Sequence, residues 1–414
     1  MKISSIKNFP KDSKKTSQLI VLVFMLINLV FKLFNISYTS FYLDEANQVF
    51  MSLQTIKEIY LESLQFPNGP LYTILFGGWI KIFGISEFSG RLFSVLASVL
   101  TVPAIFYLVK KHFQIRVAIA AVAIFTLSNW QYYYAHEARS YTLISLLVVL
   151  SFNSFFNYFI AFRKIHLLWY ILLTTVLFYI HLTSVFILSV QGIISLFYIR
   201  KHVAKVILLW LAMFIPVILL SLWLINNSWF GGRETVWMEA PQFQDLINMF
   251  SQYFNHKYIF YAFLTLIVVY LVKAILNREY DKKFWGMFLW GVLPVIAIFF
   301  VSIYYNPRFT YRYMLYATIG LYISYAILLA KVFKSNYIFY LLLLATLAIQ
   351  AIHINPKLKA DGDWRSAVNY YKSVKKDNSA TIIAAAYLNV PFAYYYDKDI
   401  FKDYRNLYQN LLDE

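Results

Sequence analysis

Residues 19–46 read LIVLVFMLINLVFKLFNISYTSFYLDEA, an apolar run that leads to two adjacent carboxylates, Asp44 and Glu45. The run from Leu19 to about Ile36 follows a basic start, MKISSIKNFPKDSKKTS, which resembles the start of a signal peptide. It is longer than the roughly 7–15 apolar residues of a signal-peptide core, and no small-x-small cleavage site follows it. We therefore expect an uncleaved first span with both acids just beyond its outer end.

The whole chain has the composition of a membrane protein. Of its 414 residues, 60% are hydrophobic and 14% are charged, whereas soluble domains are about 45–50% apolar and about 25% charged. Cytoplasmic loops rich in Lys and Arg explain the formal charge of +17, so we expect no nucleic-acid partner. The absence of cysteine excludes disulfides, thiolate metal sites and a cysteine nucleophile.

Recurring basic clusters separate apolar segments whose lengths are near the about 20 residues that a spanning helix needs. If all these clusters face the cytoplasm, the chain is an all-α polytopic protein with eleven spans. The expected spans cover residues 18–37, 90–110, 115–131, 140–162, 167–181, 183–199, 204–225, 258–277, 284–304, 311–331 and 336–353.

The same topology predicts how the chain is divided. A basic cytoplasmic N-terminus (1–17) precedes a transmembrane module (18–353) with external loops at 38–89 and 226–257, and a small external lobe (354–414) ends the chain. Residues 70–83 are too short for a span, and counting them would turn the later basic clusters outward, so we predict an interfacial or re-entrant helix there. The lobe is expected to be α/β, with a helix over 361–375 and a β-prone run at 380–387.

The adjacent acids Asp44 and Glu45 are the first chemical signal. Apolar surroundings raise the pKa of a carboxylate, which suits a general base, while the neighbouring acid can bind a hydroxyl or a cation. The alternative is an ordinary helix N-terminus, where acids favour the macrodipole.

A second signal is the external turn Tyr132-Tyr133-Tyr134-Ala135-His136-Glu137-Ala138-Arg139-Ser140-Tyr141. His136, Glu137 and Arg139 lie within four residues, so donors, an acceptor and aromatic surfaces meet at one membrane face. These residues and Tyr141 are candidate substrate-binding groups. The alternative is an interfacial aromatic belt with a surface ion pair, which contributes little stability.

A third set of candidates lies at the outer ends of other spans. Arg91 and His181 are candidate substrate-binding residues. Arg308 and Arg312 are four residues apart, so they share a face and can clamp a phosphate if their segment is helical. The alternatives are snorkelling arginines and a structural histidine. The loop from Asn226 to Gln242 adds tryptophans and carboxylates around two glycines, which suits a sugar ring or an interfacial loop equally well.

In their order and spacing, these motifs resemble the GT-C membrane glycosyltransferases of the protein O-mannosyltransferase and lipid A aminoarabinose transferase superfamily. The resemblance covers roughly residues 18–325 and has one departure, because Phe66-Pro67-Asn68-Gly69-Pro70 lacks the paired prolines often found there. The matching pieces are Asp44-Glu45, Gly69-Pro70-Leu71-Tyr72, Trp79, Lys81, Phe83-Gly84, Ser86-Glu87-Phe88, Arg91-Leu92, His136 to Tyr141 and Arg312-Tyr313, with Asp363-Trp364-Arg365 resembling the start of an external domain in bacterial relatives.

The resemblance implies an inverting transferase that moves a monosaccharide from a polyprenyl-phosphate carrier to an extracytoplasmic acceptor. It implies that Asp44 is the catalytic base and that Glu45 orients the acceptor or the sugar. Arg139, Arg308 or Arg312 would hold the phosphate of the carrier. No metal or other cofactor is expected. The acceptor remains open among glycolipids, polysaccharides and proteins.

Residue usage rich in Lys, Asn, Ile, Tyr and Phe is typical of a bacterial protein, so we expect a multi-pass protein of the bacterial plasma membrane. Membrane lipids are its surroundings, and we expect a monomer or a weak oligomer. Two other functions stay open. A lipid-linked sugar flippase would carry polar groups near the midplane, where this sequence has few charges. An inactive scaffold would need no intact acid pair.

Overall fold

The computed structural model describes residues 14–65, 68–161, 163–226, 238–355, 362–376, 383, 385–407, 409 and 411. These residues are helical or irregular, and their one isolated β-bridge pairs Asn68 with His181. The longer helices are α1 (Lys14–Leu33), α4 (Pro70–Phe83), α5 (Glu87–His112), α6 (Ile115–Thr126), α8 (Tyr141–Ala161), α9 (Lys164–Ile180), α10 (Ser184–Ser195), α11 (Ile199–Leu219), α13 (Phe243–Tyr253), α14 (Lys257–Asn277), α15 (Lys282–Tyr304), α16 (Ala317–Val332), α17 (Asn336–Ile352) and α18 (Trp364–Val374). The shorter ones are α2 (Leu43–Ser52), α3 (Ile56–Ser63), α7 (Asn129–Ala135), α12 (Ser221–Asn226), α19 (Asn389–Tyr396), α20 (Lys398–Lys402) and the 3₁₀ turns η1 (Leu196–Tyr198), η2 (Tyr311–Met314) and η3 (Ala386–Leu388).

The helices confirm a multi-pass membrane protein. In the described part of the chain, six helical segments are long and apolar enough to cross a membrane, namely α1, α5, α8, α14, α15 and the continuous run Ser184–Leu219. Each of the eleven predicted spans coincides with a helix or with two consecutive helices. The run Ser184–Leu219 contains two predicted spans and is bent at His202, whose backbone is not helical (φ −145°, ψ 46°). The predicted span 115–131 is divided between α6 and α7.

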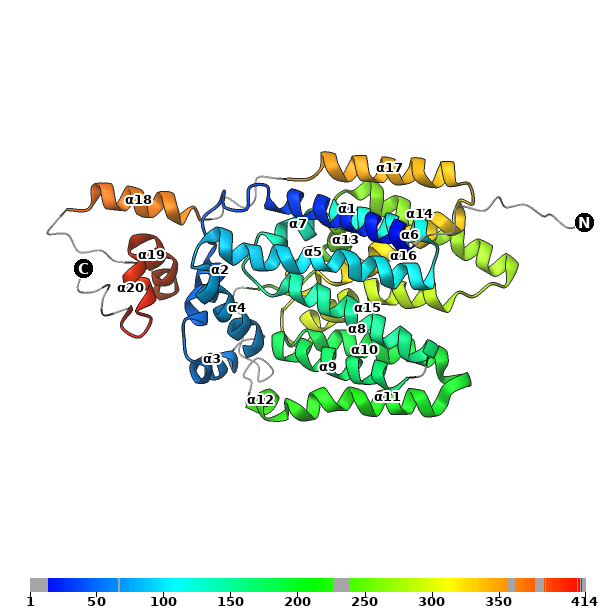
Figure 1. The fold of residues 1–414 in the computed structure, drawn as a ribbon, viewed down its shortest axis with the longest axis horizontal. Helices are drawn as coiled ribbons and strands as arrows, with labels where there is room; N and C mark the ends of the chain where they lie inside the picture. Colours follow the sequence, from blue (N-terminus) through cyan, green and yellow to red (C-terminus); the bar gives the residue numbers. More distant parts are fainter. Residues whose placement is uncertain are drawn as a thin grey trace, which may run out of the picture.

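Basic clusters from distant parts of the chain share one end of the bundle. Helix α5 begins beside α2 and α4 and ends at the opposite side of the molecule with Lys110 and Lys111 (Figure 1). Contacts at that far end join Lys110 to Ser17, Arg116 to Asn336 and Lys331 to Asp281. The predicted topology assigns these basic clusters to one membrane face, so it requires them to lie at the same end of the bundle.

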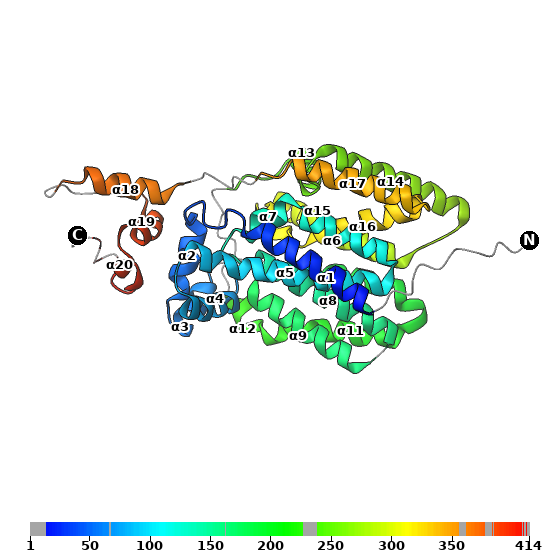
Figure 2. The same ribbon diagram turned by 45° about the horizontal axis from the view of Figure 1, so that its top comes forward.

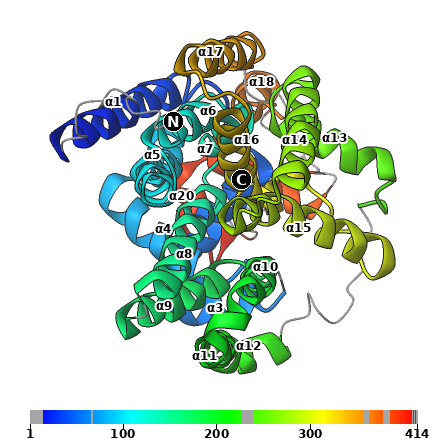
Figure 3. The same cartoon turned by 90° about the vertical axis from the view of Figure 1, so that its right-hand side faces the viewer.

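Helix α16 forms the centre of the bundle (Figure 3). All its residues from Ala317 to Ala330 are buried. It packs closely on α15 because two glycines meet at the crossing: a Cβ on Gly320 would lie 2.5 Å from the backbone nitrogen of Gly291. Small residues that allow such an approach are common where membrane helices pack.

The first loop, between α1 and α5, and the C-terminal helices gather at the other end of the bundle (Figures 1 and 2). Helices α2, α3 and α4 follow α1 directly, and α4 has only 14 residues, fewer than the about 20 that a span requires. Helices α19 and α20 pack on α2 through aromatic pairs: Phe41 lies 5.2 Å from Tyr394 and Phe50 lies 5.8 Å from Phe401, between ring centroids.

The prediction of an α/β lobe at the C-terminus needs correction. Helix α18 occupies most of the predicted helix 361–375, but the described residues of 362–411 contain no strand. Half of the β-prone run 380–387 lies outside the described residues, and its end belongs to the 3₁₀ turn η3. The described part of this region is therefore helical.

Candidate active site

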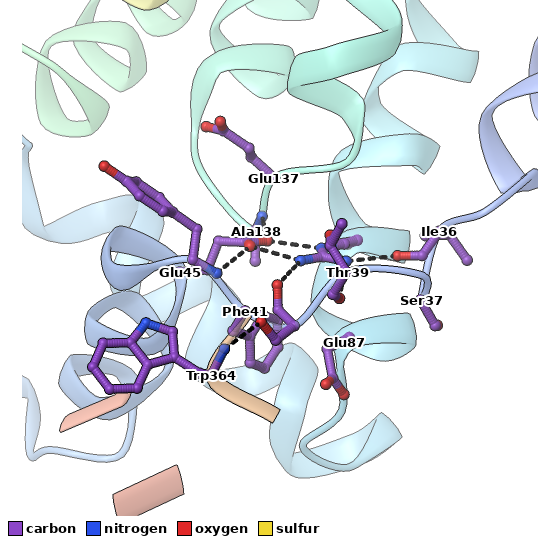
Figure 4. A network of polar contacts seen from close by, with 12 residues as sticks. Ile36, Ser37, Thr39, Phe41, Glu45, Glu87, Glu137, Ala138 and Trp364 are labelled. Atoms are coloured by element: carbon purple, nitrogen blue, oxygen red, sulfur yellow. Dashed lines mark hydrogen bonds and ion pairs between the residues drawn. The ribbon is translucent and has the colours of Figure 1, made fainter. Parts of the chain in front are cut away.

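The carboxylate of Glu45 is buried and saturated by four N–H groups (Figure 4). Arg91 donates from Nε to Oε1 at 2.9 Å and from Nη2 to Oε2 at 2.8 Å. The backbone N–H groups of Ala138 and Tyr42 each donate to Glu45 at 2.9 Å. The first loop, the span α5 and the turn after α7 therefore meet at this one carboxylate.

Arg91 is equally saturated. Its remaining guanidinium N–H groups donate to the carbonyl oxygens of Ile36 (2.8 Å), Thr39 (3.0 Å) and Ser40 (2.8 Å). All five of its donors are thus used within the protein, and only 1% of the residue is exposed. We therefore expect Arg91 and Glu45 to position the loop, rather than to contact a substrate directly.

This anchored segment starts helix α2 and presents Asp44 in its first turn. The Asp44 carboxylate forms an ion pair with Arg312, with 2.6 Å between Oδ2 and Nη1, and both side chains are partly exposed. Arg139 approaches from the turn after α7, with Nη1 3.4 Å from the Asp44 carbonyl oxygen. The structure thus brings one partly exposed acid together with two arginines.

The condition under which Arg308 and Arg312 would share a helical face, a helical segment, is not met. Helix α15 ends at Tyr304, residues 306–310 are irregular, and Arg312 lies in the 3₁₀ turn η2. Pro307 explains why α15 does not continue towards Arg308, because proline lacks a backbone N–H and disfavours helix in the residue before it. Arg312 meets Asp44, while Arg308 is buried in the preceding segment, where its backbone N–H donates to Ser302 at 3.0 Å.

Glu137 lies within the electrostatic reach of both Glu45 and the Asp44–Arg312 pair. Its side chain points away from the Glu45 network (Figure 4), and its carbonyl oxygen accepts from the Ser94 hydroxyl at 2.6 Å. Burial and, to a smaller extent, the charge of Glu45 raise the pKa of Glu137 to about 8, although the charge of Arg312 opposes this rise. Glu137 is therefore largely protonated at neutral pH.

Tyr141 and Arg139 belong to the same corner. Tyr141 is the first residue of α8 and is buried, with its ring 5.3 Å from that of Tyr134. The Arg139 guanidinium lies 6.0 Å from the centroid of the Tyr141 ring. An aromatic face at this distance attracts a cation and helps to hold Arg139 beside Asp44.

His181 is fully buried in the turn between α9 and α10. The Thr183 backbone N–H donates to its Nδ1 at 3.2 Å, so the ring proton is on Nε2. Burial lowers the pKa of His181 to about 3, and the charges of Arg139 and Arg312 act in the same direction. No described residue accepts a hydrogen bond from Nε2, and the ring lies 5.1 Å from that of Tyr313, the neighbour of Arg312.

His136 is buried at the end of α7. Its Nε2 lies 2.6 Å from the carbonyl oxygen of Lys32. Lys32 itself turns inward from α1, with its ammonium group donating to the Ser98 hydroxyl at 2.5 Å. Burial lowers the pKa of His136 to about 4, so the ring is neutral at physiological pH.

A cavity of about 370 Å³ opens beside these residues. Its walls come from the first loop, the turn after α7 and the start of α18, and its lining includes Tyr42, Tyr133, His136, Glu137, Asp363 and Arg365. Asp44 is outside this lining, but Glu137 lies close enough to Asp44 for that charge to affect its pKa.

Sequence reasoning missed several residues of this region. Gln48, one helical turn after Asp44, has its Oε1 3.5 Å from Nη1 of Arg139, and that spacing was visible in the sequence. Glu87 and Tyr395 join the first loop to the C-terminal helices, and no local signal pairs residues so far apart. Residues 227–237 of the loop from Asn226 to Gln242, for which sugar binding and an interfacial role were both open, lie outside the described residues. Among the described residues, no group of three or more His, Asp or Glu side chains could hold a metal ion.

Solved structures with this fold are membrane glycosyltransferases. The chain is similar to ArnT from Cupriavidus metallidurans bound to undecaprenyl phosphate, with a TM-score of 0.56 and 13% identity over 95% of this chain and 72% of ArnT. It is also similar to the apo oligosaccharyltransferase of Archaeoglobus fulgidus, with a TM-score of 0.58 and 12% identity over 89% of this chain and 59% of that one. No family model and no curated protein sequence matches the chain.

These matches define the class of protein. The chain is an all-α, multi-pass membrane protein with a GT-C-like fold, and the likeness extends over about nine tenths of its length. The fold implied by the sequence resemblance is thereby confirmed. The chain spans less than two thirds of the archaeal oligosaccharyltransferase, and the similarity does not extend to the rest of that enzyme.

Proposed function

We propose that this protein is an inverting glycosyltransferase that takes a monosaccharide from a polyprenyl-phosphate carrier on the extracytoplasmic side of a bacterial plasma membrane. The observation that carries the proposal is the Asp44–Arg312 ion pair with Arg139 beside it, at the end of the bundle opposite the basic clusters. One acid and two guanidinium groups suit an attack on a sugar phosphate, since the acid can take a proton while the arginines hold the phosphate.

In this mechanism Asp44 acts as the general base. One carboxylate oxygen accepts the proton of an acceptor hydroxyl while the acceptor oxygen attacks the anomeric carbon. The bond from that carbon to the phosphate oxygen breaks, and polyprenyl phosphate leaves with the electron pair. Attack from the face opposite the phosphate inverts the anomeric configuration. An acceptor amine would instead be oriented by a hydrogen bond to Asp44.

The phosphate is assigned to Arg139 and Arg312, because both lie at Asp44 and guanidinium groups bind phosphate oxygens through paired N–H donors. The Nε2–H of His181, buried within the field of the same two arginines, is a further donor for this anion. Arg308 remains a weaker candidate, since it lies outside the Asp44 pair. A phosphate bound at Arg312 would loosen the ion pair and release Asp44 for the acceptor.

The similarity to ArnT, solved with undecaprenyl phosphate, supports a polyprenyl-phosphate donor. A lipid carrier also suits the geometry, because its tail can lie in the bilayer while its phosphate meets the arginines at the outer end of the spans. Grouping of the candidate residues at one end of the bundle favours a transferase over a flippase, which would need polar sites near the midplane.

The first test is release of polyprenyl phosphate from radiolabelled polyprenyl-phosphate sugars by the purified protein, with envelope extract as the acceptor source. We expect Asp44→Asn to lower acceptor-dependent release by at least about a hundredfold, with an unchanged melting temperature. Asp399→Asn is the matched control, because Asp399 carries the same charge on an exposed C-terminal helix, and it should retain wild-type release. Normal release by Asp44→Asn, or transport of label across liposomes without release, would contradict the proposal.

A further inference from the structure

The hydrogen bonds of His136 fix which of its ring nitrogens is free. The carbonyl oxygen of Lys32 can only accept, so Nε2, at 2.6 Å from it, carries the proton. In the neutral ring Nδ1 is then an acceptor. No described residue donates a hydrogen bond to this atom, and only 3% of the residue is exposed.

A buried acceptor without a partner destabilises a fold, and such atoms in native proteins are few. Nothing in the local backbone requires Nδ1 to be unpaired, because the bond from Nε2 already orients the ring. A donor from outside the protein would satisfy this acceptor if it reached Nδ1 directly or through one water.

The cavity lined by His136 shows where that donor would bind. Its volume of about 370 Å³ lies within the range of small-molecule sites, roughly 300–1,000 Å³. Tyr42 and Tyr133 contribute aromatic rings to the lining, and Glu137 and Arg365 contribute polar groups. Rings beside groups that donate and accept hydrogen bonds suit a hydroxylated sugar ring better than an apolar chain.

We propose that His136 Nδ1 accepts a hydrogen bond from a sugar hydroxyl bound in this cavity, which makes His136 a substrate-binding residue for a carbohydrate. This inference rests on the proposed transferase function and names the chemistry of one of its ligands. Two sources share this chemistry: the sugar of an acceptor and the sugar of the lipid-linked donor. The sugar of the acceptor substrate is the source that the cavity lining favours. Gly362, Asp363, Arg365 and Ser366 line the cavity from the C-terminal region outside the bundle, whereas Asp44 and its two arginines are not part of the lining.

Two substitutions at His136 separate binding from structure. His136→Gln places an amide near the position of Nε2, so it can still donate to the Lys32 carbonyl but has no acceptor at Nδ1. His136→Asn does the reverse, because its Oδ1 takes the position of Nδ1 and no group replaces Nε2. A purely structural histidine would therefore tolerate Gln and suffer from Asn.

The kinetic test measures polyprenyl phosphate release by the full-length protein while donor and acceptor concentrations are varied separately. We expect His136→Gln to keep the wild-type melting temperature and to raise KM for one substrate about three- to tenfold, as befits one neutral hydrogen bond. His136→Asn should melt lower and keep the wild-type KM. A rise in acceptor KM assigns the hydroxyl to the acceptor, and a rise in donor KM assigns it to the donor sugar. Unchanged KM values in His136→Gln would overturn the proposal.

A second readout needs no catalysis, so its failure differs from failure of the transferase function. Water-soluble methyl glycosides are added to the wild-type protein and the two variants, and the melting temperature is measured. At least one glycoside should raise the melting temperature of the wild type and of His136→Asn, and raise that of His136→Gln less. The proposal is overturned if no glycoside stabilises the wild type, or if all three proteins respond equally, even where Asp44→Asn has abolished release.

Discussion

Glu137 is the acid in this site whose charge depends most on its surroundings. Its pKa is raised to about 8 by burial, with further contributions from the neighbouring carboxylates. Because the protonated form predominates at neutral pH, the side chain can both donate and accept a hydrogen bond beside the cavity. A glutamine has nearly the same shape and hydrogen-bonding capacity as this protonated form.

The raised pKa predicts a pH-dependent stability. The folded state binds the proton of Glu137 more tightly than the unfolded state, whose pKa is near 4.5. The contribution to the free energy of unfolding is thus complete below pH 4.5 and declines as pH rises towards 8 and beyond. Glu137→Gln should melt at about the wild-type temperature at pH 5 and a few degrees above it at pH 9.

Scanning calorimetry across this pH range checks the prediction. Glu239→Gln is the control, because it removes an exposed carboxylate from another external segment, and its melting curve should follow the wild type at every pH. A Glu137→Gln curve that also stays parallel to the wild type would show that Glu137 is already ionised in the folded protein.

The sequence was a better guide to which residues lie together in the site than to the environment of each residue. Asp44 and Glu45 are adjacent, and His136, Glu137 and Arg139 lie within one turn, so their proximity needed no tertiary information. The different environments of the two adjacent acids depend on Arg91 and Arg312, which are 46 and 268 residues away from their partners. Sequence spacing carries no information about such contacts.

At the scale of elements, the first loop is fastened to the bundle by a backbone contact. The N–H of Gly69 donates to the carbonyl oxygen of Ile180 at 2.8 Å, next to the bridge between Asn68 and His181. A Cβ on Gly69 would lie 2.0 Å from the Tyr179 carbonyl oxygen, although its φ of −73° suits any residue. The requirement for glycine comes from this close approach between α4 and α9.

Gly69→Ala should therefore detach the start of α4 from the end of α9, lower the melting temperature by several degrees and disturb His181. Gly78→Ala is the matched control in the same helix, because a Cβ there meets nothing within 4 Å, and alanine is about 1 kcal/mol more favourable than glycine within a helix. Calorimetry and limited proteolysis of the first loop distinguish the two. Equal melting temperatures for both variants would mean that the loop moves to make room.

Hydropathy predicted where helices cross the bundle, but the ends of several helices depended on local chemistry. Ser128 interrupts the predicted span 115–131, since its hydroxyl caps α7 by accepting from the Gln131 N–H at 3.3 Å. Pro307 separates the end of α15 from the irregular segment that bears Arg308 and leads to the turn with Arg312. Composition over a window of 20 residues averages out such single-residue signals.

At the scale of the molecule, the C-terminal helices are held to the first loop by the Tyr395 hydroxyl. It accepts from the Phe41 N–H at 2.6 Å and donates to Glu87 at 2.8 Å. Glu87 also forms an ion pair with Arg365 at 2.6 Å. This small network joins three distant segments beside the cavity. The C-terminal region is too short for a core of its own, so its position depends on these long-range contacts and could not be predicted from the sequence alone.

Tyr395→Phe removes the hydroxyl and leaves the buried N–H of Phe41 without its acceptor. We expect residues 362–407 to be cleaved about tenfold faster in limited proteolysis, because the lost bonds favour local opening of this region. Tyr370→Phe, at a well-exposed tyrosine of α18, is the control and should be cleaved at the wild-type rate. An unchanged rate in Tyr395→Phe would show that aromatic packing alone holds the helices.

The cavity also has a place in the order of synthesis. The Ser40 hydroxyl donates to the carbonyl oxygen of Gly362, 322 residues later, and the Phe41 N–H donates to Tyr395, 354 residues later. The first loop therefore leaves the ribosome long before its partners exist. A nascent chain, or one stopped after the last span, would insert with its helices in place but with one wall of the cavity missing. Synthesis of residues 362–395 would thus be the event that finishes the site.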